Sequence, residues 1–356
     1  MEANAVSSLR QTILDNRAAM PAERVAAMLQ HFSGAADVTV LDMRAPSSGG
    51  FSSGAQFIDA SFDGGEPESL FLKFHGDAPV TSFHIYNLAG QFAVQKVMFD
   101  AGLPVPEPLY LDADGTFLGC SGYVMRQTGG EAGSAKAWCD GALATASPDD
   151  RDQMLADAIR QLVAIHALDK DDPKLAFLYE VASGEDSIER EINWALDLAQ
   201  YHGLEDHRVA SAAEALLSRR PAGHVDVVNH GDFKFDNLMF TDAKVSAIID
   251  FEMTNVAPRE MDLAYLLFVT RSVSPPDQPN PGWFPDVSQL IAMYEDAGGE
   301  KIRDFEYYQD LAAFKFSVMM VAFVPRLGLL ESAPRMLDDY WHELERISSL
   351  GAATAG

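Results

Sequence analysis

Residues 227–240 read VVNHGDFKFDNLMF and residues 245–252 read VSAIIDFE, and these two stretches decide the fold. The first begins with an apolar run that leads into His-Gly-Asp, ending at Asp232. A short loop then places Asn237 five residues after that aspartate, and the second stretch is an apolar run that delivers Asp250 at its end. Short apolar runs bounded by turn-forming residues are typical of buried strands. The pattern therefore predicts a strand, a loop, a strand, a turn and a strand that ends in an acid.

The polar residues of this pattern are of the types that phosphoryl transfer requires. The reaction needs a carboxylate that orients and deprotonates the attacking hydroxyl, and oxygen ligands that hold Mg²⁺ against the nucleotide phosphates. We predict the first role for Asp232 and the second for Asn237 and Asp250, because an amide oxygen binds Mg²⁺ without adding negative charge. Taken singly, Asp236 and Asp242 are ordinary turn formers. The combined spacing favours an ATP- and Mg²⁺-dependent phosphotransferase.

Residues 230–237, followed by Asp250, resemble the signature of the aminoglycoside phosphotransferase and choline kinase-like family. That signature is His-Gly-Asp, four residues, Asn, and then an apolar strand that ends in Asp. The likeness continues over residues 258–264, PREMDLA, which are similar to the family's Pro-x-x-x-Asp-Leu-Ala. The resemblance implies that His230 and Asp262 give structural support to the catalytic loop.

The same resemblance implies an α+β protein with the bilobal protein kinase-like fold. Strand and turn patterns over residues 38–125, interrupted by one helical pattern over 82–101, predict a small β-rich lobe. We place this nucleotide-binding lobe, with a helical segment before its strands, at residues 1–127. Gly-Gly at 129–130 is a natural hinge. Residues 128–356 then form a mostly helical lobe that is expected to hold the catalytic loop, the metal site and the acceptor pocket.

The N-terminal lobe carries the residues that are expected to bind ATP. Lys73 lies in an alternating strand, and a lysine in such a place is more often exposed to solvent. Its position between a Gly-rich turn and a helix instead favours the family's role, which is to pair with the α- and β-phosphates. The Gly/Ser run at 47–54 resembles the family's phosphate-covering loop, where small residues let backbone N–H groups approach the phosphates. The residues that we predict to do so are Gly49, Gly50 and Ser52.

Three other residues of this lobe are predicted to contribute to nucleotide binding. Met125 and Gln127 belong to the strand that runs into the hinge. Gln91 stands where family members usually have the Glu that pairs with the strand lysine. A neutral amide can still bond an ammonium group, but it loses roughly half the strength of a charge-assisted hydrogen bond. A different register, a neighbouring residue in this role and slower catalysis all remain open as explanations.

Composition limits the classes of partner. The chain has 26 Lys and Arg against 53 Asp and Glu, a formal charge of −27, which repels nucleic acid and anionic membranes. Two cysteines without a CxxC pair predict neither a disulfide framework nor a zinc site. The longest apolar run, 316–324, is too short to span a membrane, and residues 1–20 lack the apolar stretch of a signal peptide. We expect a cytoplasmic protein; the sequence does not indicate its oligomeric state.

Two rival classes stay in view. The first is an inactive kinase-like nucleotide-binding module, which only Gln91 suggests. The second is a metal-dependent hydrolase built on His230, Asp232 and Asp250, which would need further His or carboxylate ligands at strand or helix spacing. The sequence offers no such set.

The predicted acceptor is a hydroxyl of a small molecule, and two chemical classes are left open. Residues 250–254, DFEMT, resemble the Asp-Trp-Glu-Met-Ala-Thr run of kinase-like domains associated with acyl-CoA dehydrogenases, which implies a hydroxyacyl-CoA. An aminoglycoside or another aminoalcohol would suit the acidic composition better. The proline-rich loop at 274–285 is either a lid over the acceptor or a mere connector. His166 lies on the apolar stripe of a helix and is predicted to be a core histidine.

Overall fold

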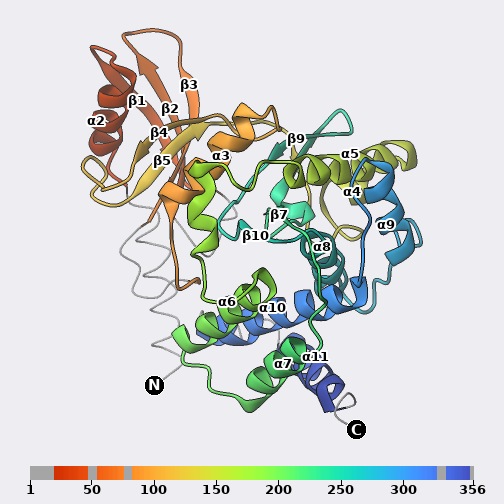
Figure 1. The fold of residues 1–356 in the computed structure, drawn as a ribbon. Coiled ribbons are helices and arrows are strands. Elements are labelled where there is room, and N and C mark those ends of the chain that lie inside the picture. The colour runs from red at the N-terminus through yellow and green to blue at the C-terminus, as the bar shows by residue number, and fades with distance from the viewer. Residues whose placement is uncertain (1–19, 47–53, 76–81, 327–333, 353–356) are drawn as a thin grey trace. The chain divides into compact units, whose positions relative to one another are not determined.

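The computed structural model describes residues 20–46, 54–75, 82–326 and 334–352 (Figure 1). The contacts divide the chain into two compact units. The first consists of the described residues up to Phe99 and of Pro106–Thr128, and the second consists of Asp100–Val105 and the described residues from Gly129 onward. The first unit is rich in strands and the second is mostly helical, so the predicted α+β class is confirmed.

A five-stranded antiparallel sheet forms the first unit, in the order β1-β2-β3-β5-β4. Its strands are β1 (Val38–Arg44), β2 (Gly54–Phe62), β3 (Glu68–Phe74), β4 (Pro108–Asp112) and β5 (Gly122–Arg126). Buried and partly exposed residues alternate along β2, because successive side chains of a strand point to opposite faces. The buried face packs against α2 (Ala22–Ser33), which contributes Val25, Met28 and Leu29 to the core (Figure 1).

The helix that the sequence predicts over residues 82–101 is shorter in the structure. It is α3 (Leu88–Asp100), and the Asn87 side-chain oxygen accepts the N–H of Gly90 at 2.8 Å in the manner of an N-terminal cap. The predicted start was wrong because apolar residues before Asn87 continue the helical periodicity, whereas the capping chemistry is at Asn87.

Two small antiparallel sheets in the second unit contain the sequence that decides the fold. Their strands are β6 (Glu131–Ala132), β7 (Asp226–Asn229), β8 (Leu238–Thr241), β9 (Lys244–Ile248) and β10 (Asn255–Pro258). β7 pairs with β10, and β8 lies between β6 and β9. Asp242 and Ala243 have φ values of 50° and 58°, which a two-residue hairpin turn between β8 and β9 requires. The predicted order of strands and turns over residues 227–252 is thereby confirmed.

Helices make up most of the second unit (Figure 1). They are α4 (Gly141–Thr145), α5 (Pro148–His166), α6 (Ser187–Tyr201), α7 (His207–Ser218), α8 (Glu260–Val273), α9 (Val287–Asp296), α10 (Phe305–Arg326), α11 (Pro334–Ala352) and the 3₁₀ turns η1 (Pro173–Tyr179) and η2 (Phe235–Asn237). The Ser147 side chain accepts the N–H of Asp150 at 3.2 Å, so α5 begins with a side-chain cap. Within the described parts of the chain, no helix is long and apolar enough to cross a membrane.

The segment Asp100–Val105 belongs to the second unit, although the chain before and after it belongs to the first. Within this segment, the carbonyl oxygen of Pro104 accepts the N–H of Ile248 at 2.7 Å. The end of β9, two residues before Asp250, is therefore held by a part of the chain that lies far earlier in the sequence.

Candidate active site

One buried carboxylate, that of Asp262, holds the backbone of the loop that follows β7. Its Oδ2 accepts the N–H of His230 at 2.7 Å, and its Oδ1 accepts the N–H of Gly231 at 2.8 Å. Asp262 lies in the first turn of α8 and is 1% exposed. Burial by itself raises the pKa of the Asp262 carboxyl, but hydrogen bonds from His166 and Gly231 outweigh it and hold the pKa below its usual value. The carboxylate therefore remains ionised and fixes the first two residues of the loop.

His166, at the end of α5, contacts the carboxylate of Asp262. Its Nε2 lies 3.2 Å from Asp262 Oδ2, and its Nδ1 lies 2.7 Å from the hydroxyl of Tyr294 in α9. The side chain is buried, as the sequence predicted for a core histidine. Its contact with the anchor of the loop was missed, because helical periodicity indicates burial but not which distant segment lies opposite.

Gly231 and His230 fix the course of the loop. Gly231 has a φ of 81°, and a Cβ at this position would collide with the carbonyl oxygen of Met253, so only glycine fits. His230 is fully buried, and its Nε2 lies 3.1 Å from the carbonyl oxygen of Ile249. Because a carbonyl only accepts, this nitrogen carries the hydrogen. The His230 side chain thus links the end of β7 to the residue just before Asp250.

The Asp232 carboxylate has one oxygen that is fixed and one that is available. Oδ2 accepts Nδ2 of Asn237 at 2.9 Å and Nζ of Lys234 at 3.0 Å. Asn237 Nδ2 also donates to the Asp232 carbonyl oxygen at 2.9 Å, so the amide orients the whole residue. Asp232 is 4% exposed, and its Oδ1 is buried without a hydrogen-bond partner among the described residues. A buried carboxylate oxygen in this state is suited to accept a proton or a hydrogen bond from a ligand.

Asp250 comes directly after a residue that is bonded to Asn237. The N–H of Ile249 donates to the carbonyl oxygen of Asn237 at 3.0 Å. Asp250 itself has a φ of 71°, a left-handed conformation that costs a non-glycine residue about 1–3 kcal/mol. Such residues concentrate at functional sites, where the surrounding structure maintains the strain. The fold thus brings the backbones of the two predicted metal ligands together.

Lys234 is a charged residue of the loop for which the sequence pattern predicts no role. Its Nζ lies 3.0 Å from Asp232 Oδ2 and 3.7 Å from Asp236 Oδ2. Burial lowers the pKa of Lys234. The negative charges of Asp232, Asp236 and Asp250 raise this pKa by a larger amount, so it lies above its usual value. The Lys234 ammonium is therefore paired with the carboxylates of Asp232 and Asp236. Its place two residues after Asp232 was visible in the sequence, but the side-chain direction was not.

Asp236 feels the same crowding of negative charge. Loss of hydration raises its pKa, Lys234 opposes this, and repulsion from Asp232 and Asp250 adds to it, which gives a pKa of about 6. The side chain as a whole is 40% exposed, so water screens part of this effect, although Oδ1 itself is buried. The loop thus holds more negative charge than its own lysine neutralises.

Residues 52–305 match the profile of a protein family described as the phosphotransferase enzyme family, APH. This match covers more than half of the chain. The chain belongs to the phosphotransferase enzyme family.

Curated proteins are similar to part of this chain. Acyl-CoA dehydrogenase family member 11 of Gallus gallus is 28% identical over 206 residues, which are 57% of this chain and 25% of that protein. The Homo sapiens protein of the same name is 25% identical over 240 residues, or 64% of this chain and 30% of that protein. The chain therefore spans only about a quarter to a third of the length of these relatives.

Solved structures show that the phosphotransferase has the protein kinase-like fold. A protein from Ralstonia eutropha, assigned to the aminoglycoside phosphotransferases, superposes with a TM-score of 0.67 at 16% identity, over 93% of this chain and 97% of that one. Plasmodium vivax ethanolamine kinase superposes with a TM-score of 0.61 at 12% identity, over 91% of this chain and 86% of that one. A variant of aminoglycoside phosphotransferase APH(4)-Ia, in complex with ADP and hygromycin B, superposes with a TM-score of 0.55 at 14% identity, over 92% of this chain and 98% of that one. The predicted fold is confirmed.

The donor atoms at the phosphotransferase loop fit a magnesium ion. The described residues contain no group of three or more His, Cys, Asp or Glu that could hold a metal. Mg²⁺ does not require one, because it takes one or two protein ligands and fills its shell with phosphate and water oxygens. Asn237 and Asp250 supply an amide and a carboxylate, and the buried, unpartnered oxygens of Asp232 and Asp236 show where further positive charge would be favourable.

The residues predicted for the nucleotide belong to the first unit of the phosphotransferase. Lys73 lies in β3, paired with Ala55 and Tyr123, and its side chain is largely buried. Gln91 in α3 is 4% exposed, and its Oε1 has no hydrogen-bond partner within the described residues. The other two predicted residues with described positions are Met125, buried in β5, and Gln127, whose N–H donates to the Ser69 carbonyl at 3.0 Å. Gly49, Gly50 and Ser52 lie outside the described residues.

The loop at 274–285 is anchored to the second unit in the described conformation. Trp138 Nε1 donates to the carbonyl oxygen of Gln278 at 2.8 Å, and Phe284 is buried. The Arg151 guanidinium lies over the Trp283 ring, with its Cζ 4.2 Å from the centroid of the ring. These contacts hold the loop at several points along its length.

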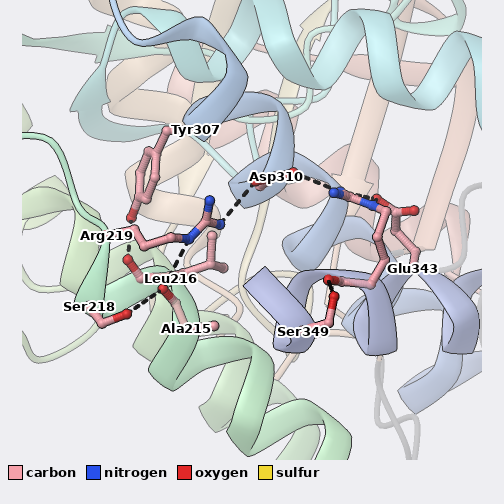
Figure 2. Close-up of polar contacts among 9 residues, drawn as sticks. Ala215, Leu216, Ser218, Arg219, Tyr307, Asp310, Glu343 and Ser349 are labelled. Carbon is pink, nitrogen blue, oxygen red and sulfur yellow. Dashed lines mark hydrogen bonds and ion pairs between the residues drawn. The ribbon is translucent and has the colours of Figure 1, made fainter. Parts of the chain in front are cut away.

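A cavity of about 870 Å³ lies among α7, α8, α10 and α11, and no residue of the loop at 230–237 lines it. Its wall carries an ion-pair cluster that is centred on Asp310 (Figure 2). Arg219 approaches one oxygen of Asp310 at 3.0 Å, and Arg346 approaches the other at 2.7 Å. Both oxygens of this carboxylate are thus paired, unlike those of Asp232.

Proposed function

We propose that this phosphotransferase moves the γ-phosphoryl group of ATP onto a hydroxyl of a small molecule. The observation that carries the proposal is the asymmetry of Asp232. Asn237 and Lys234 hold its Oδ2, whereas its buried Oδ1 has no partner among the described residues. A general base requires such an arrangement, in which one oxygen sets the orientation and the other accepts the proton.

In the proposed reaction, Asp232 Oδ1 accepts the acceptor's O–H as a hydrogen bond and aligns that oxygen with the γ-phosphorus. The oxygen–phosphorus bond forms as the bond from the γ-phosphorus to the bridging oxygen of ADP breaks, and the hydroxyl proton passes to Asp232. Asn237 and Asp250 would hold Mg²⁺, which when bound neutralises charge on the phosphates. Lys234 offers an ammonium group 3.0 Å from Oδ2 of the base, where it would help to hold the carboxylate in position.

The nucleotide-binding part of the proposal rests on the family resemblance of the first unit. We assign residues 1–127 to a nucleotide-binding lobe and residues 128–356 to the catalytic lobe. Lys73 is the proposed phosphate ligand, and its burial in a strand supports a role other than that of a solvated surface lysine. The remaining proposed nucleotide contacts are Gly49, Gly50, Ser52, Gln91, Met125 and Gln127.

The acceptor is proposed to belong to one of two classes. Similarity to acyl-CoA dehydrogenase family members 10 and 11 supports a hydroxyacyl-CoA. Structural neighbours that bind hygromycin B or gentamicin, or that are named ethanolamine kinase, support an aminoglycoside or aminoalcohol. We propose a cytoplasmic location from the composition and from the chemistry of ATP.

The test is Mg²⁺-dependent release of ADP from ATP across a panel of aminoglycosides, choline-like alcohols, sugars and hydroxyacyl-CoAs. One class should stimulate turnover, Asp250→Ala should abolish it, and Asp232→Asn should lower it about 10³-fold while nucleotide still binds. Asp171→Asn, a change to an exposed surface carboxylate, is the matched control and should leave turnover unchanged. Parental turnover by Asp232→Asn would refute the assignment of the base, and failure to bind any nucleotide would refute the proposed function.

A further inference from the structure

Tyr265 lies one turn after Asp262 in α8, and residues three apart occupy the same face of a helix. It therefore faces the loop that Asp262 anchors. Tyr265 lines a small cavity of about 10 Å³ together with Gly231 and Asp262. The residue is 2% exposed, and its hydroxyl has no hydrogen-bond partner within the described part of the chain. A buried hydroxyl without a partner is unfavourable for folding, which calls for a functional explanation.

Among the described residues, buried acceptors without a partner near Tyr265 include Oδ1 of Asn229 and of Asn255, which line the same cavity, and Oδ1 of Asp232, which is the charged one. Burial raises the pKa of Tyr265 well above its usual value, and the charge of the Asp232 carboxylate and a hydrogen-bonding approach of its side chain raise the pKa further, although the geometry is short of a formed hydrogen bond. Asp232 Oδ1 is likewise buried and unpartnered among the described residues. One group is a donor and the other an acceptor, so the two have complementary chemistry. Catalytic hydrogen bonds are often long or poorly aligned without ligands and shorten in the loaded enzyme.

We propose that Tyr265 is a positioning residue of the phosphotransferase reaction, whose hydroxyl donates to Asp232 Oδ1 and sets the plane of the catalytic carboxylate. A carboxylate oxygen has two lone pairs, so Oδ1 can accept Tyr265 and the acceptor hydroxyl together. With Asn237 and Lys234 on Oδ2, every degree of rotation of the carboxylate is then fixed. This inference rests on the proposed function, because it assigns a task to the base named there.

The test is Tyr265→Phe, which removes only the hydroxyl. We expect kcat to fall about 10-fold or more, because a misoriented base loses alignment. The KM for ATP should stay within about two-fold and the Tm should not fall, since the hydroxyl makes no hydrogen bond of good geometry with the described residues that could be lost. A merely structural role would give the opposite result, a lower Tm with an unchanged kcat.

Tyr307→Phe is the matched control, because Tyr307 is a buried tyrosine of the same unit. Its hydroxyl donates to the Leu216 carbonyl at 3.2 Å, a bond that Figure 2 shows beside the Asp310 cluster. Loss of this bond should lower the Tm by about 2 °C and leave kcat unchanged. The two variants thus separate an effect on catalysis from an effect on stability.

Two comparisons decide between failure of this inference and failure of the proposed function. If Asp232→Asn is inactive while Tyr265→Phe keeps the parental kcat, only the inference is overturned; parental turnover by Asp232→Asn overturns both. A crystal structure with ADP and Mg²⁺ gives a readout that needs no turnover. Tyr265 Oη within about 3 Å of Asp232 Oδ1 supports the inference, and a different partner for either atom contradicts it.

Discussion

The loop at 230–237 and the helices α6 and α10 both bury charged side chains, but they pair these charges to different extents. In the helices, Lys315 Nζ and Glu191 Oε2 are 2.6 Å apart, and both side chains are at most 4% exposed. The carboxylate of Glu191 also accepts Nδ2 of Asn255. In the loop, Asp232 keeps one oxygen without a partner among the described residues, and three carboxylates surround a single lysine. Charge is balanced in one region and left unbalanced in the other.

The difference in charge pairing indicates different roles for the helices and for the loop. Satisfied buried polar groups specify and rigidify a structure, whereas unsatisfied ones reduce its stability unless a ligand completes them. The Asp310 cluster in Figure 2 follows the pattern of the helices, since both of its carboxylate oxygens are bonded to arginines. The loop therefore differs from these two clusters, because a cationic or hydrogen-bonding ligand could complete its buried Asp232 carboxylate.

Asp262→Ala removes a fully hydrogen-bonded carboxylate that holds the backbone of the loop. We expect this variant to have the largest effect on stability. The change leaves the buried N–H groups of His230 and Gly231 without an acceptor, so we expect a loss of about 5 kcal/mol in the free energy of unfolding. Urea-induced unfolding measures this loss. Asp171→Ala, an exposed control, should change it by less than about 0.5 kcal/mol. Similar midpoints for both variants would contradict the anchoring role.

The buried pair of Lys315 and Glu191 offers the next largest effect. Lys315→Met should lower the free energy of unfolding by about 3 kcal/mol, because it leaves a buried carboxylate without its counter-ion. Combining it with Glu191→Gln removes both charges and keeps an oxygen acceptor for Asn255, so most of the loss should be recovered. Thermal and urea unfolding of the single and double variants give the comparison. A single variant as stable as the parent would mean that the helical region does not depend on balanced charge.

The smallest effect concerns a charge at the surface. Asp206 caps α7, and hydrogen bonds from Arg208 lower its pKa from the usual 3.8 to about 2. A carboxyl with a lowered pKa in the folded state contributes stability above pH 4 and loses it as the pH falls toward 2. Asp206→Asn should therefore cost about 0.5–1 kcal/mol at pH 7, and the difference from the parent should shrink as the pH falls. A difference that stays constant from pH 7 to pH 3 would exclude a role for the charge.

Local signals in the sequence predicted the loop and the strand order around it, because both depend on residues that are neighbours in the chain. The start of α3 was misplaced for the same reason, since apolar residues before Asn87 imitate a helical face. The partners of His166 and the surroundings of the Tyr265 hydroxyl could not be predicted. Both residues lie on helices whose periodicity reports burial, and the direction of their polar atoms depends on how distant segments pack.

The short segment Asp100–Val105 has a consequence for how this protein can be divided. Because Pro104 supplies the acceptor for Ile248, a fragment that begins at Gly129 would lack part of its own structure beside Asp250. The second unit is thus discontinuous in the sequence. During synthesis, its segment Asp100–Val105 is made before the last residues of the first unit. Recombining such proteins by exchanging contiguous halves should fail at this junction unless the six residues travel with the half that needs them.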